Sequence, residues 1–335
     1  MVSWLYARMA KITFYEMKAW ETAYVQKHLS GHELVFCEEP LTEKTLSHAE
    51  GADVVSVFIH SHIDKGLMER LPSLGLIATR STWCDHIDLH AAREKGITVA
   101  TVPRYGDNTV AEHTFALILS LTRKIHASFM RLYCGSERES SLTGFDLKGK
   151  TIGIIGGGKI GLHVARIAKA FSMDVLVYDI NHDPFMAEIL DFSYAQLADL
   201  LRESDIVSLH APLNDATFHL LDRQTMASMK DGAILINTAR GGLVDTQALL
   251  ECLEAGKISG AGLDVIEGEE EVKEEKDILN RSPDAKTPES IRAHKILEME
   301  NVVFTPHNAF NSREALYRIL DTTIRNVRDH IGADR

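Results

Sequence analysis

The chain has 335 residues, of which 45% are hydrophobic and 25% charged; this is ordinary globular usage and excludes wholesale disorder. Its 36 basic and 48 acidic residues give a net charge of −12, which disfavours general binding to a nucleic-acid backbone. No apolar run approaches the ~20 residues of a membrane-spanning helix, and no basic region precedes a long apolar core at the N-terminus. We therefore expect no nucleic-acid partner, no membrane partner and no secretion signal.

The cysteines and histidines indicate a reduced compartment and no metal centre. The four cysteines lie far apart and form no CxxC pair: Cys37, Cys84, Cys134 and Cys252. This spacing argues against a disulfide scaffold or a zinc ribbon and predicts a cytoplasmic protein. His60 and His62 stand at strand spacing near Asp64, but no third or fourth ligand follows, so no metal is expected.

Short β-branched runs alternate with amphipathic stretches along the first third of the chain. The expected strands are residues 12–15, 34–36, 54–58, 76–79 and 97–99, and the expected helices are 19–29, 43–49, 64–70 and 87–95. Alternation of this kind predicts an α/β fold with parallel sheets, here one five-stranded domain.

A different segment follows this domain. Residues 109–124 (TVAEHTFALILSLTRK) form a helical pattern that is more apolar than one covered face needs, which favours an interface between subunits or domains. Residues 136–144 are polar and rich in turn formers.

A second βα series begins at Lys150. Its expected strands are 151–155, 175–178, 206–209, 233–236, 261–263 and 302–304, and its expected helices are 160–171, 194–202, 223–229 and 246–255. Six strands suit a complete dinucleotide-binding sheet. The charge run at 267–276 predicts a solvated loop, residues 277–300 are helix-prone, and 313–331 form one amphipathic closing helix capped by Asn311 or Ser312.

A glycine-rich turn opens the second series. The segment KTIGIIGGGKIG (150–161) places Gly156, Gly158 and Gly161 in a GxGxxG pattern between an apolar strand and a helix, with Lys159 and Ile160 inside the turn. The first glycine permits the tight turn, the second lets a pyrophosphate approach the backbone, and the third allows close packing of helix on strand. The helix N-terminus faces the phosphate charge.

Asp179 ends the next expected strand, 18 residues after Gly161. A carboxylate at that place bonds the adenine ribose hydroxyls and repels a 2′-phosphate, so the pattern favours NAD over NADP. The alternative is an ordinary turn residue at a strand end.

Polar residues also follow the other strands of this series. In chain order these are His210, Ala211 and Pro212, then Thr238, Ala239, Arg240 and Gly241, then Asp264, then Pro306 and His307. Ligands bind beyond the carboxyl ends of the strands in an open parallel sheet, so we expect these groups to meet a nucleotide and a substrate.

The types of these residues suggest a chemistry. Arg240 offers a planar fork for a carboxylate and an adjacent carbonyl oxygen, and His307 is suited to proton exchange near neutrality. An acid beside His307 would hold the imidazolium, and Glu269 is a candidate. Next to a nicotinamide, these groups predict hydride transfer to or from a 2-oxo or 2-hydroxy acid. Taken singly, each is more often an ordinary surface residue, so the prediction depends on their joint placement.

These motifs resemble those of the D-isomer-specific 2-hydroxyacid dehydrogenases over nearly the whole chain from about Lys11. The resemblance is carried by the glycine turn and by NTARGG (237–242), GAGLDVIEGE (260–269), TPHNAF (305–310) and TVPRYGDNTVAEH (101–113), in the order of the family. It implies a catalytic set of Arg240, Glu269 and His307, with Asp264 against the nicotinamide side of NAD. Within the family, the chain is most similar to the D-lactate dehydrogenase-like branch, in which Tyr105 and Phe310 match positions that line a small substrate pocket.

The resemblance also implies an architecture of two doubly wound α/β domains. A flavodoxin-like substrate domain would comprise residues 1–108 and 313–335, and a Rossmann NAD-binding domain would comprise 109–312, with the substrate cleft between the two. Residues 109–124 would be the dimerisation helix of a homodimer.

Two departures from the family pattern concern the site. Where the family usually has Ser-x-Gly, whose backbone N–H groups cradle the substrate carboxylate, this chain has Ser81, Thr82 and Trp83. The indole either narrows the carboxylate site or turns aside and leaves the backbone path intact. An acidic run, Glu269–Glu271, replaces the usual acid–proline step.

The first hypothesis is an NAD-dependent D-2-hydroxyacid dehydrogenase that reduces a small 2-oxoacid, with pyruvate to D-lactate as the first choice. A dehydrogenase for a larger 2-oxoacid stays open. A second hypothesis, of another class, is an NAD-sensing protein similar to corepressors of the same fold, which act through partner surfaces.

Overall fold

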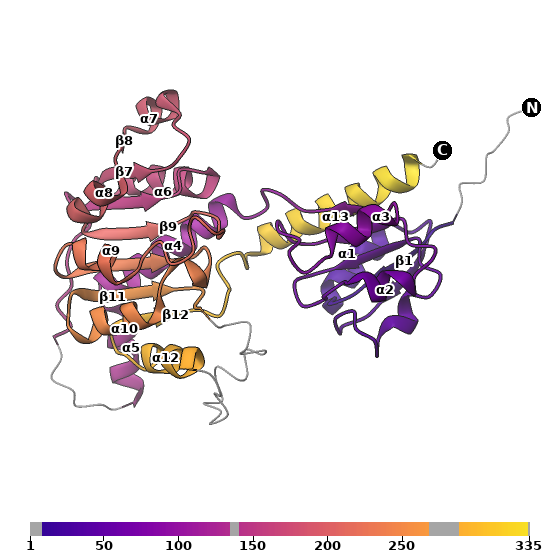
Figure 1. The fold of residues 1–335 in the computed structure, drawn as a ribbon, viewed down its shortest axis with the longest axis horizontal. Coiled ribbons are helices and arrows are strands. Elements are labelled where there is room, and N and C mark those ends of the chain that lie inside the picture. Colours follow the sequence, from indigo (N-terminus) through magenta and orange to yellow (C-terminus); the bar gives the residue numbers. More distant parts are fainter. Residues whose placement is uncertain (1–8, 135–140, 268–287, 334–335) are drawn as a thin grey trace, which may run out of the picture. The chain divides into compact units, whose positions relative to one another are not determined.

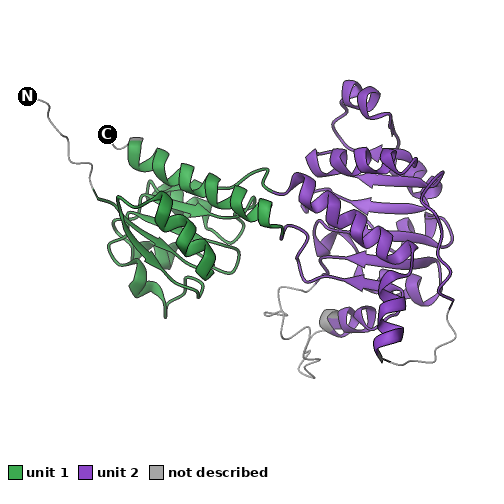
Figure 2. Ribbon diagram, turned by 180° about the vertical axis from the view of Figure 1, so that it is seen from behind, with its two compact units in different colours: residues 1–105, 312–335 green, residues 106–311 purple. Residues whose placement is uncertain are grey.

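A computed structural model of the chain describes residues 9–134, 141–267 and 288–333. The chain divides into two compact units (Figure 2): unit 1 comprises residues 1–105 with 312–335, and unit 2 comprises 106–311. The assignment of a substrate domain to residues 1–108 and 313–335 and of an NAD-binding domain to residues 109–312 stays a prediction. Glu269 and most of the charge run at 267–276 lie outside the described residues, as do residues 136–140 of the polar segment.

Unit 1 contains a five-stranded parallel sheet with the order β2-β1-β3-β4-β5. Its strands are β1 (Lys11–Phe14), β2 (Glu33–Phe36), β3 (Val54–Val57), β4 (Leu76–Thr79) and β5 (Thr98–Ala100). Its helices are α1 (Ala19–His28), the 3-10 turn η1 (Leu46–Ala49), α2 (Lys65–Glu69), α3 (Leu89–Glu94) and α13 (Arg313–Ala333). This strand order is that of flavodoxin-like folds.

Apolar residues that alternate along the strands of unit 1 supply two cores, one on each face of the sheet. Ile12, Leu76 and Ala78 pack with Val25 of α1 and Leu320 of α13, whereas the intervening strand residues pack with η1, α2 and α3. The closing helix begins after Ser312, whose Oγ accepts from Ala315 N at 3.1 Å. The capping residue is therefore Ser312, one of the two candidates.

Unit 2 contains a seven-stranded parallel sheet with the order β12-β11-β10-β9-β6-β7-β8. Its strands are β6 (Thr151–Ile155), β7 (Asp174–Tyr178), β8 (Ser193–Tyr194), β9 (Ile206–Leu209), β10 (Ala233–Asn237), β11 (Ile258–Leu263) and β12 (Val302–Phe304). The order reverses at the neighbours β6 and β9. An α/β sheet opens a crevice at such a switch point, beyond the carboxyl ends of its strands.

Helices cover both faces of this sheet (Figure 1). The helices of unit 2 are α4 (Asp107–Thr122), α5 (Ile125–Cys134), α6 (Lys159–Ala170), α7 (Pro184–Leu190), α8 (Leu197–Glu203), α9 (Arg223–Ser228), η2 (Gly241–Leu243), α10 (Thr246–Glu254) and α12 (Pro288–Leu297). Phe115 of α4 and Val164 of α6 belong to one core, and Leu249 of α10 belongs to the other. Two doubly wound parallel-sheet units are thus present, as the sequence predicts.

Four local features differ from the sequence-based expectation. The helix expected at 43–49 is reduced to η1, because the Thr45 hydroxyl donates to Pro40 O at 2.7 Å and accepts from Thr42 N at 2.9 Å. Such local bonds compete with a helix. The edge strand β8 has two residues, too few to show a period, and the sequence analysis does not predict the helices α5 and α7. Within the described residues, no helix combines the length and apolarity needed to cross a membrane.

Candidate active site

The glycine turn after β6 is built by close backbone contacts. Gly156 has φ +103°, and a Cβ on it would lie 2.5 Å from the carbonyl carbon of His210. A Cβ on Gly161 would lie 2.0 Å from Gly156 O. Because these two positions have no room for a side chain, β6, β9 and the N-terminus of α6 meet as the motif predicts.

The second glycine of the motif, Gly158, borders open space. A Cβ on Gly158 would meet no atom within 4 Å, so the space before α6 is open. Gly158 is the N-cap of α6, and Lys159 and Ile160 form its first turn. The first N–H groups of a helix have no intrahelical acceptor, and the helix dipole favours an anion there. This end of α6 fits a pyrophosphate.

Asp179 lies directly beside the turn. Its Oδ2 accepts from Gly157 N at 2.7 Å, and its Oδ1 accepts from Asn181 N at 2.8 Å. These two backbone N–H groups, one of them in the glycine turn, orient the carboxylate. Each oxygen keeps a further lone pair, so the predicted bond to a ribose hydroxyl remains open to it.

His210 stands across the crevice, at the end of β9. Its N–H donates to Ile155 O at 2.7 Å, and its Nε2 shares a hydrogen bond with Ser208 Oγ at 2.8 Å. Burial lowers the pKa of His210 to about 3, so its ring is neutral. Its Nδ1 is buried without a hydrogen-bond partner. Ala211 and the exposed Pro212 follow.

Arg240 ends a loop whose backbone is hydrogen bonded to the buried side chain of Asn237. Asn237 is 1% exposed; its Nδ2 donates to Arg240 O at 2.9 Å and its Oδ1 accepts from Ala239 N at 3.0 Å. The Thr238 hydroxyl is hydrogen bonded to that of Thr114 on α4 at 3.0 Å. The guanidinium also bonds its own loop, from Nη1 to Ala239 O at 2.7 Å.

Asp264 holds the loop that carries His307. It is 1% exposed, and its carboxylate accepts from Asn308 N at 2.8 Å and Ala309 N at 2.9 Å. His307 donates its backbone N–H to Asp264 O at 2.8 Å. The histidine has φ +47°, an uncommon conformation for a residue with a side chain, and it lies on the exposed side of this loop. The predicted contact of Asp264 with the nicotinamide stays a prediction.

The remaining predicted substrate residues lie partly in unit 1. Trp83 is 53% exposed, so the core of the unit does not enclose its indole. The turn before it is tied down, because Ser81 Oγ donates to Trp83 O at 2.5 Å and Thr82 Oγ1 donates to Val102 O at 3.1 Å. Tyr105 closes unit 1, and its carbonyl accepts from Arg318 Nε at 2.7 Å. Phe310 is part of unit 2, three residues after His307.

Glu269, the acid expected beside His307, lies outside the described residues. The neighbouring Glu267 is described and is engaged elsewhere. Its carboxylate bonds His219 Nε2 at 2.6 Å and Thr246 Oγ1 at 2.9 Å. Among the described residues, no group of three or more His, Cys, Asp or Glu side chains could hold a metal ion.

Comparison with known proteins identifies the family. The model of the D-isomer-specific 2-hydroxyacid dehydrogenase NAD-binding domain matches residues 115–309. The D-lactate dehydrogenase of Escherichia coli is 37% identical over 321 residues, which are 95% of each chain. The chain belongs to the D-isomer-specific 2-hydroxyacid dehydrogenase family.

Solved structures agree with this membership. The pyruvate reductase of Chlamydomonas reinhardtii is 33% identical, with a TM-score of 0.86 over 98% of both chains. The D-lactate dehydrogenase of Aquifex aeolicus, solved with NAD and lactic acid, is 35% identical, with a TM-score of 0.83 over 96% of both chains. The chain is thus an NAD-dependent oxidoreductase of the CH–OH group of 2-hydroxyacids, in the D-lactate dehydrogenase-like branch. This favours the enzyme hypothesis over a corepressor-like binding protein.

The sequence does not reveal the residues whose hydrogen bonds hold the loops of the site in place. Asn237 belongs to the NTARGG motif, but the sequence predicts no role for its side chain, nor for those of His113, His219 and Thr305. His113 lies on α4, far from Thr305 in the chain, yet its Nε2 is 2.9 Å from Thr305 Oγ1. Only its place within TVAEH, a segment that already matched the family, could have marked it.

Proposed function

We propose that this dehydrogenase reduces a small 2-oxoacid, with pyruvate to D-lactate as the first choice, and that His307 is its acid and base. The observation that carries the proposal is the common edge of the unit 2 sheet: β6, β10 and β12 run parallel, so the glycine turn, Arg240 and His307 all follow carboxyl ends at that edge. The pyruvate reductase of Chlamydomonas and the D-lactate dehydrogenases among the relatives support the choice of substrate.

The residues of the chain divide the work. Gly156, Gly158 and Gly161, with Asp179, would hold the cofactor, and NADH, when bound, supplies the hydride. Arg240 binds the carboxylate of the 2-oxoacid with its fork and polarises the neighbouring carbonyl. Protonated His307 donates its proton to the carbonyl oxygen, and neutral His307 accepts the hydroxyl proton in the reverse direction.

The other predicted residues complete the proposal. Glu269 keeps His307 protonated for reduction. His210, Ala211, Pro212, Thr238, Ala239, Lys159, Ile160 and Asp264 surround the cofactor, and Thr82, Trp83, Tyr105 and Phe310 contribute to substrate binding.

Oxidation of NADH with a panel of 2-oxoacids tests the substrate. We expect pyruvate to give the highest kcat/KM and the D isomer of lactate to form. A clear preference for a branched or aromatic 2-oxoacid would instead select the larger-substrate alternative.

Replacement of His307 by Ala tests the acid–base role. Turnover should fall by about 10²- to 10⁴-fold, the usual contribution of a positioned acid or base. The Kd for NADH, measured by fluorescence titration, should change little, which separates a chemical defect from loss of the cofactor site. Full turnover would remove His307 from the mechanism.

We also propose a homodimer in a reducing cytoplasm. Helix α5 directly follows α4 and exposes large apolar side chains: Ile125, Phe129, Met130, Leu132 and Tyr133. A second copy is the expected cover for this surface. Light scattering should give twice the chain mass, and Leu132→Glu combined with Phe129→Glu should give single chains.

Cys37, Cys84 and Cys252 are free thiols, which suits the proposed reducing compartment. Cell fractionation tests whether the protein is found in the cytoplasm.

A further inference from the structure

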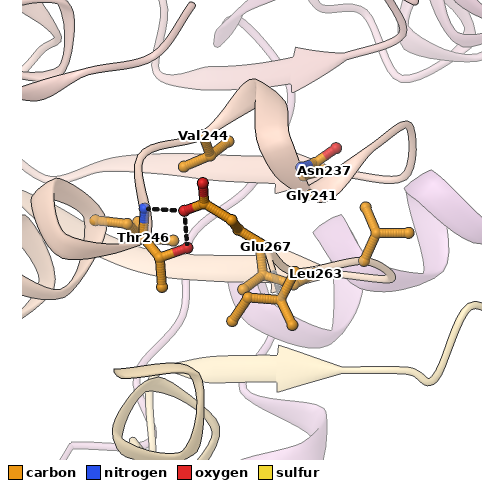
Figure 3. A pocket seen from close by; sticks show the side chains of 9 residues that line it. Asn237, Gly241, Val244, Thr246, Leu263 and Glu267 are labelled. Atoms are coloured by element: carbon orange, nitrogen blue, oxygen red, sulfur yellow. Dashed lines mark hydrogen bonds between the residues drawn. The ribbon is translucent and has the colours of Figure 1, made fainter. Parts of the chain in front are cut away.

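The carboxylate of Glu267 joins three segments of unit 2. Its Oε1 accepts from His219 Nε2 at 2.6 Å. Its Oε2 accepts from the Thr246 hydroxyl at 2.9 Å and from Thr246 N at 3.4 Å, and Figure 3 shows Glu267 facing Thr246. Glu267 follows β11, Thr246 is the first residue of α10, and His219 belongs to the loop between β9 and α9. Both carboxylate oxygens are thereby satisfied by groups of other segments.

His219 is held in place before it reaches this carboxylate. Its backbone has φ +49°, and its ring stacks on Phe218 with centroids 4.0 Å apart. Its N–H donates to Gly242 O at 2.8 Å. An uncommon backbone conformation persists only where the surroundings enforce it, and these contacts direct the imidazole at Glu267.

The same carboxylate lies beside a small cavity with a largely apolar lining. Val244, Leu249, Leu263, Val265 and Ile266 contribute to this lining, and Glu267 is the only charged residue among the residues that line it. A carboxylate in such surroundings is costly unless hydrogen bonds satisfy it. The bonds to His219 and Thr246 therefore determine where Glu267 and the backbone next to it lie.

That backbone is in contact with the residue after Arg240. A Cβ on Gly241 would lie 2.3 Å from the carbonyl carbon of Ile266 and 2.5 Å from Glu267 N. The chain at 266–267 thus packs directly on Gly241. Any shift of Glu267 moves the surface on which the Arg240 loop rests.

We propose that Glu267 and His219, with Thr246, are positioning residues for Arg240. They keep the guanidinium aimed for the 2-oxoacid carboxylate without touching the substrate. This inference rests on the proposed role of Arg240 as the carboxylate-binding group. It also leaves Glu269, and not the neighbouring Glu267, as the acid proposed to partner His307.

Kinetics of Glu267→Gln and His219→Ala test the inference. Both changes should raise KM for the 2-oxoacid by about 10- to 100-fold, the scale of a small misplacement at a reacting group. The Kd for NADH should stay within about twofold, because the glycine turn is unaffected. His219→Gln retains a side-chain donor and should restore part of the loss. Glu254→Gln, which also converts a carboxylate to an amide but at an exposed position of α10, is the matched control and should match the wild type.

A double-mutant cycle separates positioning from general destabilisation. In an Arg240→Lys background, Glu267→Gln should change kcat/KM by less than about threefold, because the group that it positions is already altered. Additive losses in the two variants would overturn the inference. If Glu267→Gln does not fold, Thr246→Val, which removes one of the hydrogen bonds, takes its place in the same cycle.

Two further outcomes distinguish this inference from the proposed function. An unchanged KM in Arg240→Lys would contradict the role of Arg240 itself. A raised KM in Arg240→Lys together with an unchanged KM in Glu267→Gln would overturn the positioning role alone. The pH profile of kcat/KM should keep its shape in Glu267→Gln, and a displaced profile would mean that Glu267 acts on the proton and not on Arg240.

Discussion

The carboxylate of Asp264 and the hydroxyl of Thr305 lie 2.5 Å apart, at the carboxyl ends of the neighbouring strands β11 and β12. The same carboxylate accepts the N–H groups of Asn308 and Ala309, so it contacts the chain on both sides of His307. His113 reaches Thr305 Oγ1 from α4 at 2.9 Å and extends this network. The loop of the proposed acid is therefore held by a buried carboxylate.

Replacing Asp264 by Asn should destabilise the protein and reduce turnover. An amide cannot accept on both sides, so one buried N–H of the loop loses its acceptor at a cost of about 1–3 kcal/mol. Urea unfolding measures the stability, and kcat with the preferred 2-oxoacid measures the chemistry. Asp231→Asn removes a carboxylate at the surface and should leave both near the wild type. Unchanged kcat in Asp264→Asn would show that the loop holds His307 without this carboxylate.

Gly161→Ala should lower thermal stability, whereas Gly158→Ala should weaken NADH binding. At Gly161 the new Cβ meets Gly156 O, so the βα unit must shift and thermal stability should fall. At Gly158 the Cβ enters open space where a pyrophosphate would approach, so the fold should persist while NADH binds more weakly. Tm and the Kd for NADH should therefore separate the two variants. Equal losses of Tm in both would contradict the assignment.

Trp83→Gly should change substrate choice and spare the fold. The indole is 53% exposed, so little core packing is lost. If the ring narrows the carboxylate site, kcat/KM for pyruvate-sized substrates should rise. Comparison with Trp20→Gly, an exposed tryptophan on α1, controls for loss of an indole in unit 1. Identical kinetics in Trp83→Gly and the wild type would mean that the ring points away from the substrate.

His210 should make the protein sensitive to acid. Burial lowers its pKa from 6.5 to about 3, so between these values the unfolded chain binds more protons than the folded one. This contribution to stability is complete above pH 6.5 and is lost as the pH falls towards 3. In His210→Gln, the fall in the urea midpoint between pH 7 and pH 5 should be smaller than in the wild type. An equal fall in both would show that His210 is already protonated in the folded state.

Local sequence determined the elements and their ends with few errors. The apolar runs at 151–155 and 206–209 are strands with these bounds, because a buried parallel strand is apolar along its whole length. The spacing of Gly156, Gly158 and Gly161 predicts a tight turn. In the structure, Gly156 and Gly161 have no room for a side chain and Gly158 borders open space. These features depend on neighbours in the chain, and so the chain alone reveals them.

The long-range contacts that position the side chains of the site could not be predicted from local sequence. Glu267 was one acid in a crowded run, and only the folded chain pairs it with His219, 48 residues away. Asp264, His113 and Thr305 likewise meet because β11, β12 and α4 pack together. The sequence by itself determined the family, the two sheets and the residue types of the site. The tertiary structure decided which polar groups satisfy one another, because burial makes each unpaired group costly and the partner is supplied by a distant segment.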